Sequence, residues 1–184
     1  FSSIDQMGRY AYANQPGIAA WNMAQLATAL LPLMPDRDAA IARFTEIVNG
    51  FAPVYQSAWR DAFGAKLGLA APDDADVDLI TEFLALMAEI GSDFTNTFRA
   101  LTDNPDAALE HQSFSAWRAK WQARVPDHAL MAQNNPAIIP RNHRVEEAIQ
   151  SAVYGDWGPF QARHSTLGSP YAQPADASFP PAPT

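Results

Sequence analysis

The 184-residue chain contains no cysteine and only two lysines, Lys66 and Lys120. Without cysteine, the chain can form neither a disulfide framework nor a zinc–thiolate site, and the composition fits a cytoplasmic protein. Acidic residues outnumber basic residues by 20 to 12, which gives a net charge of −8. Because nucleic-acid binding depends mainly on basic contacts to phosphates, this charge argues against a nucleic-acid partner.

Long hydrophobic runs and strand-like patterns are also missing. The longest apolar run, ATALLPLMP, is interrupted by Pro32 and Pro35 and is far shorter than the roughly 20 residues of a membrane-spanning helix. No stretch alternates apolar and polar residues as a half-buried strand does. The chain also lacks a Gly-rich phosphate loop and a nucleophile elbow. The residues by themselves therefore predict neither a membrane partner nor a recognisable catalytic motif.

Apolar residues instead recur at spacings of three and four along most of the chain, which predicts an all-α fold. We expect the first long helix to begin near Pro16 and to end before Pro35. Trp21 lies on the apolar face of that helix and is expected to be a core residue. Asp36 is a predicted N-cap for the next helix, and the glycine and proline that follow predict a break near residue 52.

An acidic cluster precedes the strongest helical pattern, in the stretch APDDADVDLITEFLALMAEIGSD. Acidic side chains are favourable at the positive end of a helix dipole, so the cluster predicts a helix start. Asp74, Asp76 and Asp78 also have the spacing of a calcium-binding loop. That loop would require glycine and glutamate where this chain has Leu79 and Ala85, so the helix start is the preferred interpretation.

Two other pairs of residues have both a functional and a structural interpretation. His143 lies three and four residues from Glu146 and Glu147, but so few ligands favour a solvated helix face with local ion pairs over a metal site. Trp117 and Trp121 lie one helical turn apart and could form a stacking platform. Core packing is the more common role for such a pair, and we predict it here.

The predicted organisation is one helical domain over residues 1–168, followed by a tail over residues 169–184. The tail contains five prolines and is expected to be extended.

Several stretches carry more specific information than the periodicity does. They are DQMGRYAYANQPGIAAWNMAQLATALLPL at 5–33, DFTNTFRAL at 93–101, NPAIIPRNHRVEEAI at 135–149, YGDWGPF at 154–160 and SPYAQP at 169–174. In this order they resemble the selenoprotein O family, also called YdiU, whose members are kinase-like protein adenylyltransferases. The resemblance extends from about Asp5 to Pro174. Met23 and Gln25 differ from the leucine and the basic residue that are usual in the family.

The resemblance implies that this chain is the C-terminal part of a longer polypeptide. Its fold would then be the helical C-lobe and C-terminal extension of a protein-kinase-like fold. The parent protein would transfer AMP from ATP to Ser, Thr or Tyr residues of other proteins, with magnesium. The residues that bind ATP and magnesium would lie upstream of Phe1. We therefore assign no catalytic, cofactor-binding or metal-binding residue here, and we expect the fragment alone to be inactive.

The implied partners are the N-terminal part of the same polypeptide and the protein substrates of the parent. Within the first motif, Arg9, Tyr10 and Tyr12 are expected to be structural anchors between the two parts. The alternative is that Arg9 pairs with an activation-segment carboxylate or helps to receive a substrate. A second hypothesis is that the fragment is a helical module that binds proteins and has no catalytic role.

Overall fold

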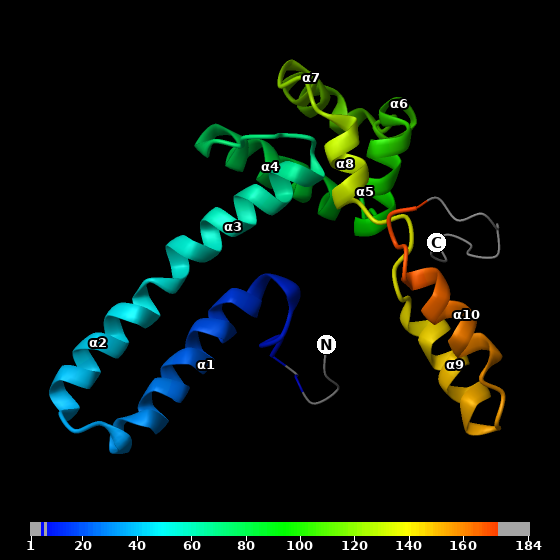
Figure 1. Ribbon diagram of the computed structural model, residues 1–184. Coiled ribbons are helices and arrows are strands. Elements are labelled where there is room, and N and C mark those ends of the chain that lie inside the picture. Colours follow the sequence, from blue (N-terminus) through cyan, green and yellow to red (C-terminus); the bar gives the residue numbers. More distant parts are fainter. Residues whose placement is uncertain (1–4, 6, 173–184) are drawn as a thin grey trace. The chain divides into compact units, whose positions relative to one another are not determined.

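The computed structural model describes residue 5 and residues 7–172, and all regular structure in them is helical (Figure 1). This confirms the predicted all-α class. The α-helices are α1 (Gln15–Leu30), α2 (Arg37–Asn49), α3 (Phe51–Lys66), α4 (Asp74–Glu89), α5 (Phe94–Asp103), α6 (Pro105–Ala108), α7 (Ser115–Ala123), α8 (His128–Asn134), α9 (Asn142–Val153) and α10 (Gly158–Leu167). Short 3-10 helices lie at η1 (Tyr12–Asn14), η2 (Leu31–Leu33) and η3 (Gln112–Phe114).

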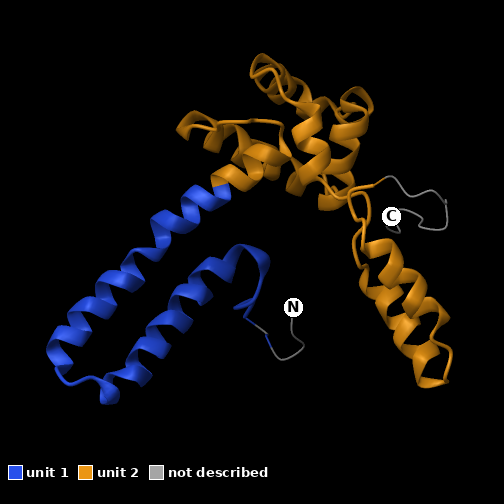
Figure 2. Cartoon of the chain, viewed as in Figure 1, with its two compact units in different colours: residues 1–59 blue, residues 60–184 orange. Residues whose placement is uncertain are grey.

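The chain divides into two compact units, residues 1–59 and residues 60–184, and α3 runs across the boundary between them (Figure 2). None of the helices in the described part of the chain is both long and apolar enough to cross a membrane.

Unit 1 is built around a helical hairpin in which α1 packs against α2. Pro32 ends the α-helix earlier than predicted, and the chain continues through η2. Asp36 caps α2 as expected, because its side chain accepts a hydrogen bond from the Ala39 backbone N–H at 3.0 Å. Among the described residues of unit 1, only Ala40 is buried.

The prediction that Trp21 is a core residue is wrong for this chain. Its side chain is 51% exposed. Apolar residues lie on more than one side of α1, whereas α2 covers a single strip of its surface, so much of the apolar surface of α1 has no cover within the unit.

Unit 2 contains the hydrophobic core. Trp117 and Trp121 are 0% and 1% exposed, and their rings stack with centroids 5.7 Å apart. Phe83 also stacks on Trp117, with ring centroids 4.3 Å apart. Each indole N–H donates a hydrogen bond to a backbone carbonyl, that of Leu79 or Leu67, at 2.8 Å. The preferred interpretation of the tryptophan pair as core packing is therefore confirmed.

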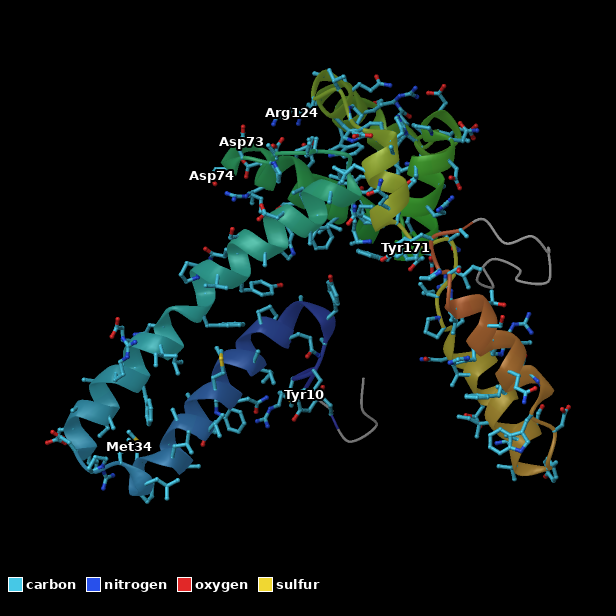
Figure 3. The ribbon with its side chains drawn as sticks, in the orientation of Figure 1. Tyr10, Met34, Asp73, Asp74, Arg124 and Tyr171 are labelled. Atoms are coloured by element: carbon cyan, nitrogen blue, oxygen red, sulfur yellow. The ribbon has the colours of Figure 1, made fainter. Side chains whose placement is uncertain are left out.

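The acidic cluster begins α4, as the preferred interpretation predicted. The Asp73 carboxylate accepts hydrogen bonds from the backbone N–H groups of Ala75 and Asp76, and the Asp76 side chain accepts one from the Asp73 N–H. Asp76 is 2% exposed and pairs with Arg124 at 2.7 Å. Figure 3 labels Asp73, Asp74 and Arg124 in this region. The reciprocal bonds form a capping box, so this stretch is a helix start and not a calcium loop.

The last two helices form a second hairpin, in which α9 packs against α10. After α10, residues 169–172 form turns and bends, and the Pro170 carbonyl accepts hydrogen bonds from the backbone N–H groups of Ala137 and Ile138. Most of the predicted tail, residues 173–184, lies outside the described residues.

Candidate functional site

The polar-aromatic motif near the start of the chain is held together by its own polar groups. The Asp5 carboxylate accepts hydrogen bonds from the backbone N–H groups of Arg9 and Tyr10, both at 2.9 Å. The bond from Tyr10 is the main reason that the pKa of Asp5 is lowered. The Asn14 and Gln15 side chains donate to the carbonyls of Gly8 and Tyr10 at 2.8 and 2.5 Å. The motif is thus a self-bonded loop that leads into α1.

The large side chains of this loop project from it and are not packed inside it. Tyr10 and Tyr12 are 42% and 74% exposed, and the Arg9 guanidinium lies 5.6 Å from the centre of the Trp21 ring. Burial, followed by the nearby Tyr55, raises the pKa of Tyr12. Among the described residues, no carboxylate lies within ion-pair distance of Arg9. The proposed anchoring role of these residues stays a prediction.

In unit 2, two family-like segments that lie far apart in the sequence are joined by an ion pair. Arg141 donates to both oxygens of Asp93, at 2.7 and 3.1 Å, and to the Asn96 side-chain oxygen at 3.0 Å. The hydrogen bond from Arg141 is the main cause that lowers the pKa of Asp93 and raises that of Arg141. Asp93 also caps α5 through the Asn96 N–H, so one carboxylate fixes both the helix start and the approach to α9.

Asn135, which begins the NPAIIPRNHR segment, is a second junction. It is completely buried, and its amide donates to the Lys66 carbonyl at 2.8 Å and to the Thr102 hydroxyl at 2.9 Å. Arg99 donates to the carbonyls of Asn135 and Tyr171, both at 3.2 Å. The segments at 93–101 and 135–149 and the described residues 169–172 therefore meet at one place.

Lys66 belongs to the same junction. Its ammonium donates to the Asn134 carbonyl at 2.8 Å and to the Asn135 side-chain oxygen at 3.4 Å, and lies 5.5 Å from the centre of the Phe98 ring. Burial in this apolar setting lowers the pKa of Lys66. The sequence pattern did not indicate a structural role for Lys66 or Asn135, because neither belongs to a helical stripe of apolar residues. The Asn-Pro pair that begins the family-like segment at 135–149 was the one sequence feature that pointed to Asn135.

The polar groups of this junction are satisfied by one another and by backbone carbonyls, so the geometry fixes segments in place and offers no reactive centre. Of the residues considered as a metal pair in α9, Glu147 pairs with Arg144 one turn away at 3.0 Å and with Arg163 of α10 at 3.3 Å. Across the described residues, no three His, Asp or Glu side chains come together in a way that could hold a metal ion.

Comparison with known proteins gives these motifs a context. The sequence model of the family described as "Protein adenylyltransferase SelO" matches residues 2–167. The chain is 51% identical over 185 residues to the "Protein nucleotidyltransferase YdiU" of Jannaschia sp. (strain CCS1), an alignment that covers 93% of this chain and 38% of that protein. The protein of the same name from Ruegeria sp. (strain TM1040) is 44% identical, with 99% of this chain and 40% of that protein covered.

The protein of the same name from Rhizobium leguminosarum bv. trifolii (strain WSM2304) is 42% identical over 207 residues. That alignment covers all of this chain and 41% of the relative. The chain thus spans about two fifths of the length of the curated relatives it matches. Since the family model covers nearly the whole sequence, the chain belongs to the protein adenylyltransferase SelO family.

Proposed function

We propose that this chain is the C-terminal helical part of an ATP-dependent protein adenylyltransferase with a protein-kinase-like fold. The observation that carries the proposal is the family match over residues 2–167, together with relatives named nucleotidyltransferases that are about two and a half times as long. In the proposed reaction, a Ser, Thr or Tyr hydroxyl of a cytoplasmic protein attacks the α-phosphorus of ATP. The hydroxyl oxygen forms a bond to the α-phosphorus and gives up its proton, the α–β phosphoanhydride bond breaks, and pyrophosphate leaves.

The described residues do not fit the binding of ATP and magnesium by themselves. Lys66 is already bonded within the junction, and Lys120 pairs with Glu82 at 2.8 Å. No suitable group of carboxylates is present in the described part of the chain. We therefore propose that the rest of the polypeptide binds both ATP and magnesium, and that the chain alone transfers no AMP.

The position of the radioactive label on ATP tests this proposal. The full-length protein, incubated with magnesium and casein, should label casein from ATP carrying ³²P at the α-phosphate but not at the γ-phosphate. The 184-residue chain alone should label it from neither. Transfer of the γ-label would make the protein a phosphotransferase. Transfer by the 184-residue chain alone would contradict the proposal that the rest of the polypeptide binds ATP and magnesium.

The partner that we propose for unit 1 is the N-terminal part of the same polypeptide. Twelve large apolar side chains of the unit are at least 36% exposed: Met7, Tyr10, Tyr12, Trp21, Leu26, Leu30, Leu33, Met34, Ile41, Ile47, Val54 and Tyr55. This many exposed large apolar side chains in a unit of 59 residues are typical of a surface that another protein segment covers. The relatives have about three fifths of their length outside the match, which is enough chain to cover it.

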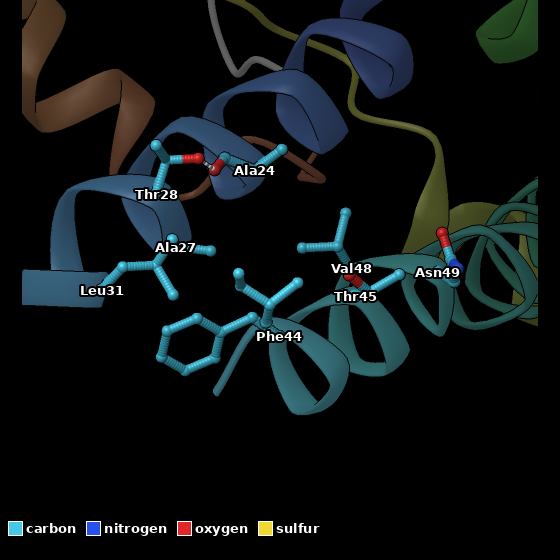
Figure 4. Close-up of a pocket in the computed structure, with 9 residues that line it drawn as sticks. Ala24, Ala27, Thr28, Leu31, Phe44, Thr45, Val48 and Asn49 are labelled. Atoms are coloured by element: carbon cyan, nitrogen blue, oxygen red, sulfur yellow. Dashed lines mark hydrogen bonds between the residues drawn. The ribbon is translucent and has the colours of Figure 1, made fainter. Parts of the chain in front are cut away.

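Within unit 1, the hairpin also has a concave site between its helices. Ala24, Ala27 and Thr28 of α1 are small and lie opposite Phe44 and Val48 of α2 (Figure 4). They leave a hollow of about 270 Å³ lined mainly by carbon atoms. A hollow of this size accommodates one or two apolar side chains of a partner segment.

Separate expression of the two parts tests this interface. The 184-residue chain and the preceding part of the polypeptide should form a complex that survives gel filtration. Leu26→Asp, at a 61% exposed site, should weaken the complex at least tenfold, whereas Arg43→Asp, on the polar surface of α2, should change it less than threefold. Equal effects of the two variants would contradict the docking of this surface.

The exposed surface of unit 1 also favours the second hypothesis, a non-catalytic module that binds other proteins. The two hypotheses differ in whether the isolated 184-residue chain can still bind substrate proteins of the parent. A binding module would capture a substrate protein of the parent with the same affinity as the full-length protein, whereas our proposal expects that capture to require the N-terminal part.

A further inference from the structure

The α9–α10 hairpin carries an open apolar groove that the proposed activity does not use. The groove has a volume of about 560 Å³ and is lined mainly by Val145, Ile149, Val153, Trp157, Phe160 and Leu167. Val153 and Trp157 are 72% and 55% exposed. A surface this apolar is typical of a site that a second segment covers.

The aromatic end of the groove is fixed before any segment binds. Trp157 and Phe160 meet edge to face, with ring centroids 6.0 Å apart. The Asp156 carboxylate accepts a hydrogen bond from the Gly158 N–H at 2.9 Å, which fixes the turn that carries Trp157. Grooves lined by fixed aromatic rings are the usual receptors for proline-rich, extended peptides, because such peptides lose little conformational entropy when they bind.

The chain itself continues from a point beside the other end of this groove. Leu167, which lines the groove, is the last residue of α10. Four residues later the chain is held by hydrogen bonds to the Pro170 and Tyr171 carbonyls, from Ala137, Ile138 and Arg99. Pro170 and Tyr171 are therefore held beside residues 137–138, which lead into α9, and beside Arg99 of α5.

The following segment, QPADASFPPAPT at 173–184, has the length and composition that the groove requires. Four of its twelve residues are proline, and its only large apolar side chain is Phe179. At about 3.1 Å per residue, the seven steps from Ala172 to residue 179 can span about 22 Å in an extended conformation. The ten-residue helix α10 is only about 15 Å long, so Phe179 can reach the aromatic end.

The charges of the two surfaces also match. The only charged residue of the segment is Asp176, midway to Phe179. The groove is flanked by Arg163, midway along α10, and by His164. The buried Nε–H of Arg163 has no acceptor among the described residues, although its Nη2 donates to Glu147 at 3.3 Å.

We propose that residues 173–184 fold back into the α9–α10 groove, with Phe179 against Trp157 and Phe160 and with Asp176 beside Arg163. The segment would cover the groove in the same molecule, and this does not depend on the proposed enzymatic activity.

A photo-crosslinking amino acid placed at position 179 of the 184-residue chain tests the proposal. Benzoylphenylalanine at this position should crosslink to peptides of α9 and α10 in the same molecule, with a yield independent of protein concentration. Crosslinks between two copies, crosslinks confined to other segments, or none at all would overturn the proposal. The same experiment in the full-length protein should give the same peptides, and a shift to upstream peptides would also overturn it.

Two matched variants test the groove itself. Ile149→Asp, inside the groove, should reduce the crosslink yield at least fivefold, whereas Tyr154→Asp, which is outside it and 87% exposed, should change the yield less than twofold. If Ile149→Asp unfolds the hairpin, Phe179→Asp provides the test without altering the groove. That variant should speed amide hydrogen exchange in α9 and α10 at least threefold, and unchanged exchange would overturn the proposal.

Discussion

Tryptophan residues in this chain differ sharply in how much they contribute to its stability, because burial and not residue type decides the contribution. Trp117 is completely buried and stacks with two other aromatic rings, whereas Trp21 is 51% exposed. We expect Trp117→Ala to lower the free energy of unfolding of the 184-residue chain by about 3–5 kcal/mol. Trp21→Ala should lower it by less than about 1 kcal/mol, since the contact with Arg9 is an exposed cation–π contact.

Urea denaturation followed by circular dichroism measures both values. In the full-length protein the Trp21→Ala effect should become larger if upstream chain covers unit 1. A loss above about 2 kcal/mol for Trp21→Ala in the 184-residue chain would contradict the exposed position of this side chain.

The Asp93–Arg141 pair should make stability depend on pH. The pKa of Asp93 in the folded chain is below its ordinary value of 3.8, so the pair stabilises the fold fully above that value. This contribution is lost as the pH falls through the lower, folded-state pKa. Asp93→Asn keeps a good helix cap and removes the charge. It should cost about 1 kcal/mol at pH 7, because both side chains are a quarter to a third exposed and solvent screens the pair.

The cost of Asp93→Asn should therefore decrease progressively as the pH falls below 3.8, and urea denaturation between pH 2.5 and 7 would measure it. Asp74→Asn is the control, because Asp74 is 99% exposed and its ion pair with Arg60 is a surface contact. A pH-independent cost for Asp93→Asn would show that the lost hydrogen-bond geometry, and not the charge, matters.

At the level of elements, the connection between α3 and α4 depends on one glycine. Gly68 has φ of +77°, and a Cβ there would lie 2.7 Å from the Asp127 nitrogen and 2.9 Å from its oxygen. The Asp127 N–H also donates to the Gly68 carbonyl at 2.9 Å, which joins this turn to the start of α8. Both the strained φ and the backbone clash therefore oppose any side chain.

Gly68→Ala should lower the melting temperature by about 4–12 °C, from a cost of about 2–3 kcal/mol. Gly91→Ala is the matched control, because Gly91 has φ of +70° but open space around its Cβ position. That variant should cost only about 1 kcal/mol. Calorimetry measures both melting temperatures. Equal decreases for the two variants would show that the contact with Asp127 does not add to the cost of the substitution.

At the level of the whole molecule, the two units differ in how well they are packed. Ala40 is the only buried residue described in unit 1, whereas unit 2 has an aromatic core. Since protection from exchange follows buried contacts, amides of α1 and α2 should exchange at least a hundredfold faster than those of α4, α5 and α7 in the 184-residue chain. Hydrogen-exchange mass spectrometry measures this, and similar protection in both units would contradict it.

Addition of the preceding part of the polypeptide should slow exchange in α1 and α2 selectively. If the rates stay unchanged while a complex forms, the partner binds elsewhere, and the exposed apolar face of unit 1 has another occupant.

The sequence alone was enough to predict the all-α class, the capped starts of α2 and α4, and the burial of Trp117 and Trp121. Helical period and helix caps are local, since each depends on residues within about four positions of one another. The family could also be predicted, because its motifs are continuous stretches of sequence. The exposure of the Trp21 side chain could not be predicted, because the apolar pattern of α1 does not show how much of the helix surface a neighbouring helix covers.

The junction of the family-like segments was decided only by the tertiary structure. Arg141 reaches Asp93 across 48 positions, and Asn135 bonds to Lys66 across 69. No periodicity marks such partners, because a hydrogen bond between distant residues depends on how the helices pack and not on their spacing in the chain. The groove between α9 and α10 was likewise decided by the tertiary structure. Its lining comes from both helices, so it exists only where the two helices pack together.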